Sequence, residues 1–96
     1  MKNITIAQLA EKIGTVELID VREPNEYAFG HIPTAKNIPV GVAIQQASQH
    51  FDETKTHYIV CRSGGRSAIT VEQLEQQGYN VINVVGGTMS WAGELV

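Results

Sequence analysis

The chain has 96 residues, of which 43% are hydrophobic and 18% are charged, and its formal net charge is −3. This composition is typical of a soluble globular protein and argues against a disordered chain or a nucleic-acid-binding protein. No apolar run approaches the roughly 20 residues that a bilayer span requires, and the first residues lack the continuous apolar stretch of a signal peptide. We therefore expect one domain over residues 1–96, in the cytoplasm, without membrane contact.

The N-terminal part predicts a helix followed by a strand. In segment 4–14, ITIAQLAEKIG, apolar residues recur at helical spacing, and Thr5 and Gln8 have the spacing of a capping box. A short amphipathic helix is therefore expected there. The run 15–22, TVELIDVR, is a compact β-type stretch that ends in charged residues and predicts a strand.

The next part of the chain predicts two helices with a short strand between them. Segment 22–33, REPNEYAFGHIP, has a proline near its start and Gly30 near its end, which indicates a short helix. Segment 35–40, AKNIPV, predicts a brief strand. From residue 40 to residue 51 the apolar positions recur at helical spacing, so this segment is expected to be largely one helix.

The last part predicts two more strands around a helix. The run 57–61, HYIVC, is the clearest strand candidate, and YNVINV, 79–84, is another. Residues 67–77 between them have the periodicity of a helix, and residues 86–96 predict one or two helical turns. Strands that are apolar nearly throughout and alternate with helices indicate an α/β fold, with a mainly parallel sheet flanked by helices on both faces.

The chain contains one cysteine, Cys61, and three scattered histidines. One cysteine cannot form a disulfide within the chain, and the histidines have no spacing that resembles a zinc site. We expect neither a metal nor a cofactor. A lone cysteine after an apolar run is often only a small buried hydrophobic residue, and the alternative is that its thiol reacts.

The residues that follow the cysteine favour the reactive alternative. If segment 57–61 is a central parallel strand, Cys61 stands at its carboxyl end, where open α/β sheets bind ligands. Two glycines allow the next residues to curl with their N–H groups pointing inward, and two guanidinium groups and a helix N-terminus add positive charge. These features lower the pKa of a thiol, so we interpret the segment as a nucleophilic cysteine in an anion-binding loop. The loop residues are Arg62, Ser63, Gly64, Gly65 and Arg66.

Three motifs resemble the rhodanese-homology family, in that family's order and at its usual separations. They are LIDVREPNEYAFGHIPTAKNIP (18–39), YIVCRSGGRSA (58–68) and GYNVINVVGGTMSW (78–91). The resemblance implies a rhodanese-like fold with a five-stranded, mainly parallel sheet and an active-site loop that starts at Cys61. It also implies a sulfurtransferase in which a donor, thiosulfate or a persulfide, loads sulfur on Cys61 and a thiol, cyanide or protein acceptor removes it.

Loop length separates this chemistry from that of related enzymes. Phosphatases and arsenate reductases of the same fold have a Cys-x5-Arg pattern, whereas the spacing here is Cys61-x4-Arg66. The shorter loop suits a sulfur atom better than a tetrahedral oxyanion. Arg62, nearer the mouth, is placed to receive an anionic donor, while Arg66 acts either electrostatically or as a clamp on the loop. A second reading is a persulfide carrier or interaction module that serves a partner protein and turns over little small-molecule donor.

Several residues outside the loop are expected to have structural roles. Asp20, Arg22 and Glu26 are interpreted as a buried or half-buried polar network, and His31 as a hydrogen-bond anchor rather than a general base. Thr34 stands where the family more often has glycine, which suggests an ordinary φ at this position. The pair Gly86-Gly87 predicts a sharp turn close to the active loop, and Met89 and Trp91 predict core or pocket-wall packing.

Overall fold

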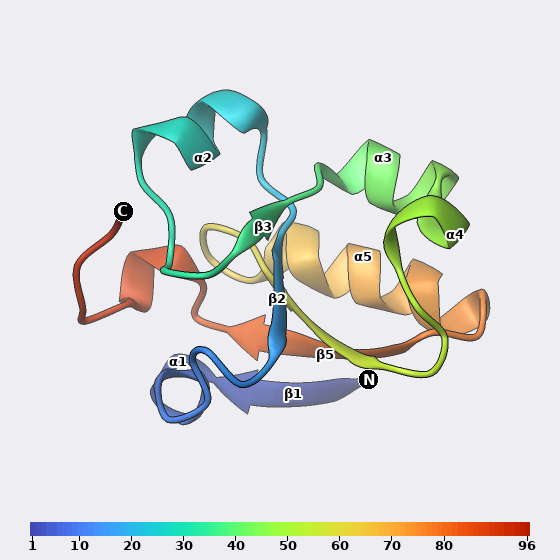
Figure 1. Ribbon diagram of the computed structural model, residues 1–96, viewed down its shortest axis with the longest axis horizontal. Helices are drawn as coiled ribbons and strands as arrows, with labels where there is room; N and C mark the ends of the chain where they lie inside the picture. The colour runs from blue at the N-terminus through green and yellow to red at the C-terminus, as the bar shows by residue number, and fades with distance from the viewer.

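The computed structural model describes residues 1–96 and contains one five-stranded sheet with the strand order β1-β5-β4-β2-β3. All neighbouring strands are parallel, and β4 lies in the middle of the sheet (Figure 1). The α/β architecture expected from the sequence, with a five-stranded parallel sheet, is confirmed. The strands are β1 (Lys2–Thr5), β2 (Glu17–Asp20), β3 (Lys36–Asn37), β4 (Thr56–Val60) and β5 (Asn80–Val85).

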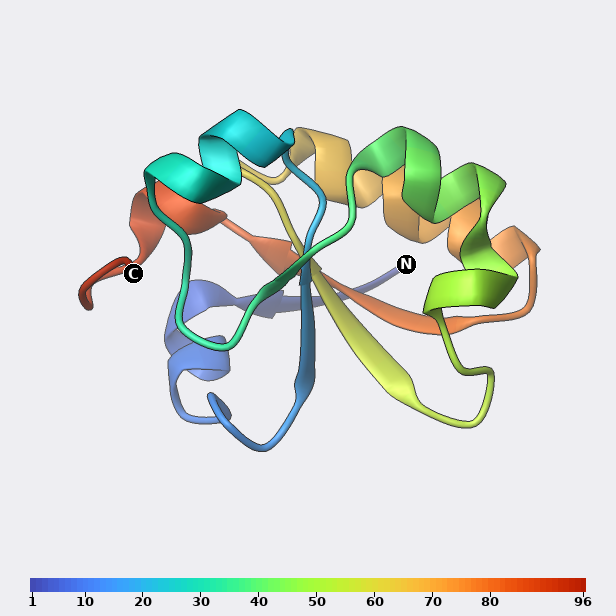
Figure 2. The ribbon, with the colours of Figure 1, turned by 45° about the horizontal axis from the view of Figure 1, so that its top comes forward.

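Helices cover both faces of this sheet. In Figure 2, α3, α4 and α5 lie above the sheet and α1 lies below it, while α2 lies near the start of α5. No helix has both the length and the apolar character that a membrane span needs. The helices are α1 (Ile6–Ala10), α2 (Pro24–Phe29), α3 (Val40–Gln45), α4 (Ala47–His50), α5 (Gly65–Gln76) and a 3-10 helix η1 (Thr88–Ser90).

Alternating side chains of the strands divide the core into two clusters. In β4, Ile59 packs with the larger cluster under α3, α4 and α5, and Val60 packs with the smaller one. The smaller cluster includes Leu9 of α1. Because successive residues of a strand point to opposite faces, Cys61 returns to the larger cluster and sits under α5. The strand register therefore decides on which face the thiol lies.

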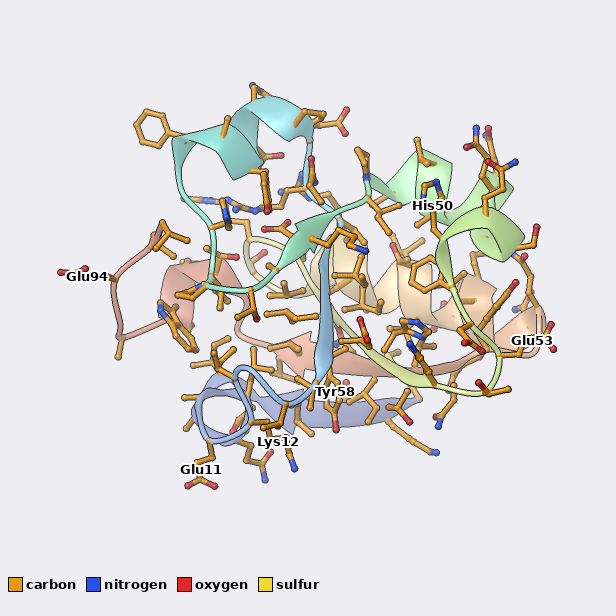
Figure 3. The ribbon with its side chains drawn as sticks, in the orientation of Figure 1. Glu11, Lys12, His50, Glu53, Tyr58 and Glu94 are labelled. Atoms are coloured by element: carbon orange, nitrogen blue, oxygen red, sulfur yellow. The ribbon has the colours of Figure 1, made fainter.

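Charged side chains of the periphery point away from the sheet. Figure 3 shows Glu11 and Lys12 projecting outward after α1, and Glu94 projecting from the C-terminal segment. His50 lies on α4, across the molecule from α2. Solvated charged side chains of this kind contribute little to the stability of a fold.

Two predictions about helices were wrong in their extent. The segment predicted as a helix over 4–14 begins with strand β1, and α1 ends at Ala10. Thr5 is nevertheless the helix cap, because its side chain accepts from the N–H of Gln8 in the expected capping box. The predicted helix over 40–51 is broken at Gln46, whose φ of −123° and ψ of 35° separate α3 from α4.

Thr34 contradicts the prediction of an ordinary φ, because its φ is 75°. Residues 32–35 form a turn in which the N–H of Ala35 donates to the carbonyl oxygen of Ile32 at 3.1 Å. With Pro33 as its second residue and a positive φ at its third, the turn has the pattern of type II, which favours glycine at that third position. Thr34 therefore has a backbone conformation that glycine adopts easily. The conformational energy of this positive φ is higher for a β-branched residue such as threonine.

A buried ion pair fixes the segment between β2 and α2. The guanidinium of Arg22 donates from Nη2 to Oδ2 of Asp20 at 2.9 Å and to the carbonyl oxygen of Gly30 at 2.7 Å. Both side chains are buried, so the hydrogen bonds offset the cost of removing the charges from water. The predicted polar network is confirmed for Asp20 and Arg22, whereas Glu26 makes a different contact, described below.

Candidate active site

The cysteine lies where the central strand turns into the longest helix. Strand β4 ends at Val60 and α5 begins at Gly65, so Cys61 and the three residues after it form the whole connection. The helix starts two residues earlier than predicted, which brings its N-terminus closer to the thiol. Gly64 caps the helix with a φ of 114°, a conformation that residues with a side chain rarely adopt.

The tight loop places hydrogen-bond donors around the sulfur. The backbone N–H of Gly64 donates to Sγ of Cys61 at 3.0 Å, and Oγ of Ser67 lies 3.4 Å from Sγ. Cys61 is 1% exposed and Ser67 is fully buried, so water does not compete for these contacts. The inward-pointing N–H groups expected from the glycine pair are therefore present at Gly64.

These contacts decide the ionisation of the thiol. Burial raises the pKa of Cys61, whereas hydrogen bonds lower it, first from the Ser67 side chain and then from three backbone N–H groups. Those groups belong to Ser67, Gly64 and Ser63. The resulting pKa lies below the ordinary value for cysteine. The expected direction is confirmed, but hydrogen bonds rather than the two arginines are its main cause.

Ser67 contacts the sulfur, a role that its position in the sequence did not single out. A serine that begins a helical segment usually caps it, so the pattern alone did not distinguish a cap from a donor to the sulfur. In the structure, the hydroxyl of Ser67 donates to the carbonyl oxygen of Gly64 at 3.0 Å and accepts from the Cys61 thiol at 3.4 Å. It lies between the helix N-terminus and the sulfur, and a rotation of its O–H bond redirects the proton to a thiolate.

We expect Ser67→Ala to raise the pKa of the Cys61 thiol and to move its reactivity to higher pH. A hydrogen bond to a charged group is strong, so at neutral pH alkylation by iodoacetamide should slow by roughly threefold to tenfold. The measurement is the alkylation rate as a function of pH, followed by intact mass. Ser63→Ala is the matched control, because the Ser63 side chain makes no hydrogen bond. An unchanged profile for Ser67→Ala would contradict the assignment.

The two arginines of the loop have different surroundings. Arg66 forms a bidentate ion pair with Glu26 of α2, with Nη1–Oε1 at 2.6 Å and Nη2–Oε2 at 2.9 Å. The hydrogen bonds from Arg66 are the main cause that lowers the pKa of Glu26 to about 2. The side chain of Arg62 is exposed and forms no ion pair or hydrogen bond. Of the two roles left open for Arg66, these contacts favour a structural one, although the group that it holds is Glu26 of α2 and not a loop carbonyl. Arg62 is free to meet an anionic donor, as expected.

A second loop supports the first from the end of β5. The N–H of Thr88 donates to the carbonyl oxygen of Cys61 at 2.8 Å, and the N–H of Met89 donates to that of Arg62 at 3.0 Å. Gly86 and Gly87 have φ values of 92° and 64° and lie at this contact, which confirms the sharp turn expected there. The backbone of the active loop is thus held by residues more than 20 positions away in the sequence.

Other residues singled out from the sequence lie outside the sulfur's immediate surroundings. Nδ1 of His31 is 2.9 Å from the carbonyl oxygen of Tyr27, and the two rings stack with centroids 3.7 Å apart. His31 is therefore an anchor for α2, as expected. Trp91 packs against the smaller core cluster, whereas Met89 is 63% exposed, which contradicts the core alternative of its prediction.

Access to the sulfur is narrow. Two surface hollows are present, one beside α1 and η1 and one near residues 14–17 and 55–58, and neither is lined by Cys61. The buried sulfur of Cys61 is therefore not part of either hollow. No group of three or more histidine, cysteine, aspartate or glutamate side chains is arranged to hold a metal ion.

Comparisons with known proteins agree with this geometry. A family model described as "Rhodanese-like domain" matches residues 5–94. The chain is 43% identical over 97 residues to "Putative sulfurtransferase YtwF" of Bacillus subtilis, covering 98% of this chain and 93% of that protein. It is 35% identical to "Putative sulfur carrier protein YrkF" of the same organism, over 95% of this chain, and spans about half (51%) of that relative.

A solved structure supports the fold independently. The crystal structure titled "Rhodanese-like Domain Protein from Staphylococcus aureus" superimposes with a TM-score of 0.90 at 41% identity. The match covers 100% of this chain and 97% of that one. The fold and the sequence motifs therefore point to the same family.

Proposed function

The chain belongs to the rhodanese-like domain family, and from this premise we propose that it is a sulfurtransferase acting through a persulfide on Cys61. The proposed donor is thiosulfate or a persulfide, and the acceptor is a thiol, cyanide or a protein nucleophile. The observation that carries the proposal is the buried sulfur, which accepts the N–H of Gly64 at 3.0 Å and has a lowered pKa. Sulfur transfer in general is also the activity named for its relatives.

The loading step needs a thiolate and a sulfane sulfur. The thiolate of Cys61 attacks the outer sulfur of thiosulfate, a new S–S bond forms, and the S–S bond of the donor breaks. Sulfite leaves with the electron pair of the broken bond. Total charge is conserved, because a thiolate and a dianion become a persulfide anion and a dianion.

The loop stabilises both anionic states of the cycle. Hydrogen bonds from Gly64 and Ser67 hold the thiolate before the attack, and N–H groups converging on the same space hold the persulfide afterwards. Gly65 begins the helix whose N-terminus faces the sulfur, and Arg62 provides the free positive charge for an approaching anion. Because the site is buried, its dipoles act without competition from water.

Unloading needs a second molecule, since the chain has no other cysteine. The acceptor attacks the outer sulfur of the persulfide and takes it, and the thiolate of Cys61 is regenerated. With cyanide as acceptor the product is thiocyanate. No cofactor or metal takes part in this cycle.

A persulfide carrier is the second candidate. It is favoured by the relative named a sulfur carrier protein, which this chain matches over 95% of its own length. A carrier loads sulfur once per chain and delivers it only to its partner protein. An enzyme turns over many times with small molecules, so the two candidates differ in turnover and not in loading.

Intact-mass analysis and thiocyanate formation test the proposal together. After exposure to excess thiosulfate and removal of the donor, the wild-type chain should gain one sulfur atom. Addition of cyanide should return the original mass, and many thiocyanates per chain should form when donor and acceptor are both present. Loading without turnover would favour the carrier. No gain of sulfur from thiosulfate or from a persulfide would contradict both candidates.

A further inference from the structure

Glu26 reaches the active loop from a different part of the chain. It lies on α2, 40 residues before Arg66, and its carboxylate engages both terminal nitrogens of that arginine. The ion pair is only partly buried, with the Arg66 side chain 39% and the Glu26 side chain 29% exposed. The contact therefore borders the solvent beside the loop.

The ion pair removes one of the positive charges that the loop offers. Two guanidinium groups follow Cys61, and the carboxylate of Glu26 neutralises the one on Arg66. A third guanidinium, on Arg22, is neutralised by the buried carboxylate of Asp20. Arg62 is then the one guanidinium near the sulfur without an anionic partner. An incoming anion meets a single unpaired positive charge, together with the uncharged N–H groups of the loop.

The negative charge of Glu26 is permanent under working conditions. The hydrogen bonds from Arg66 keep its pKa near 2, so the carboxylate is ionised throughout the neutral range. The electric field of this carboxylate opposes the approach of any anion to the loop. Since Coulomb energy is proportional to charge, the penalty for a dianion is twice that for a monoanion at the same position.

We propose that Glu26 is a specificity-determining positioning residue that holds Arg66 and tunes the site toward monoanionic sulfur donors over dianionic thiosulfate. This inference rests on the proposed function and narrows its donor to the class R–S–S⁻ or R–SO₂–S⁻. The charge of the donor is matched to the single free guanidinium of Arg62. Thiosulfate remains a substrate, but a disfavoured one.

Two sulfur donors that react by the same S–S cleavage but differ in net charge isolate the effect of the donor's charge. Methanethiosulfonate is a monoanion and thiosulfate a dianion, and in both the thiolate of Cys61 attacks the terminal sulfur. The S–S bond breaks, and methanesulfinate or sulfite leaves with its electron pair. In a ping-pong cycle the kcat/KM of the donor reports the loading step, independently of the cyanide that accepts the sulfur.

The test compares wild type with Glu26→Gln at low ionic strength. Glutamine keeps an oxygen that accepts from Arg66 while removing the charge. We expect kcat/KM to rise about twofold to threefold for methanethiosulfonate and about fourfold to ninefold for thiosulfate, because the gain in the second case is the square of the first. Salt at 0.5 M or more should reduce the difference.

The ratio of the two kcat/KM values is the decisive readout. A structural disturbance of the loop changes both donors alike and leaves the ratio constant, which would overturn the proposal. Glu75→Gln removes the same charge from an exposed position near the far end of α5 and should leave the ratio unchanged. If neither donor puts sulfur on Cys61 of the wild-type chain, the proposed function fails first, and that result is distinct from an unchanged ratio.

Discussion

Replacing Cys61 with serine is expected to abolish sulfur loading and thiocyanate formation. A serine hydroxyl is not ionised at neutral pH and does not attack sulfane sulfur, so the loss should be at least about a thousandfold, as for other enzymes that lose their nucleophile. The measurement is the intact mass of wild type and Cys61→Ser after excess thiosulfate. Since the chain has no other cysteine, any sulfur gained by the variant would contradict a persulfide at this position.

The same substitution should preserve the fold. Oxygen is smaller than sulfur, and the buried hydroxyl finds the N–H of Gly64 as donor and the hydroxyl of Ser67 as a further partner. Buried polar groups with hydrogen-bond partners cost little, so thermal unfolding of the variant should stay close to that of wild type. If the variant is folded but inactive, the loss of activity is due to the missing thiol and not to unfolding. An unfolded one would require the test to be repeated with Cys61→Ala.

Gly87→Ala is expected to destabilise the protein strongly and to inactivate the site. A Cβ atom at this position would lie 2.6 Å from the carbonyl oxygen of Cys61 and closer still to that of Arg62, and neither backbone atom can move alone. The φ of 64° adds strain for any residue with a side chain. We expect a loss of about 2–5 kcal/mol in the free energy of unfolding, measured by denaturant titration.

The activity of Gly87→Ala should fall more than tenfold, because the clash displaces the backbone that carries the nucleophile. The hydrogen bond from Thr88 to Cys61 is made by the next residue and is lost with the displacement. Gly14→Ala is the matched control. Its φ is 87°, but a Cβ there meets nothing within 4 Å, so it reports backbone strain alone, about 1–2 kcal/mol. Equal losses for the two variants would contradict a contact specific to Gly87.

The predicted elements were most accurate where a local signal and tertiary packing agree. The helix of residues 65–76 and the strand of residues 56–60 have strong periodicity, and each was found within two residues. Strand β1 was missed because three of its four residues are exposed and its hydrogen bonds come from β5, about 80 positions later. The break at Gln46 was also missed, since the apolar periodicity continues across it.

The candidate site was predicted in part. The position of Cys61 at the end of a central strand, the inward N–H of Gly64 and the lowered thiol pKa all follow from the order of residues 57–67. The ion-pair partner of Arg66 could not be predicted from this segment, because Glu26 is 40 residues away and carboxylates near strand ends commonly have structural roles. The burial of the sulfur could not be predicted from the sequence either. It depends on how the loop after β5 packs on the loop that begins at Cys61.

The sequence by itself determined the fold class and the chemistry of the loop. Strand and helix periodicity is local, and Gly64, between β4 and α5, allows the tight curl that brings its N–H toward the cysteine. The tertiary structure alone decided which charges stay free and how closely the loop is held. Those properties depend on Glu26 and Gly87, which approach the loop only after the sheet has formed, because parallel strands gather their carboxyl ends at one edge.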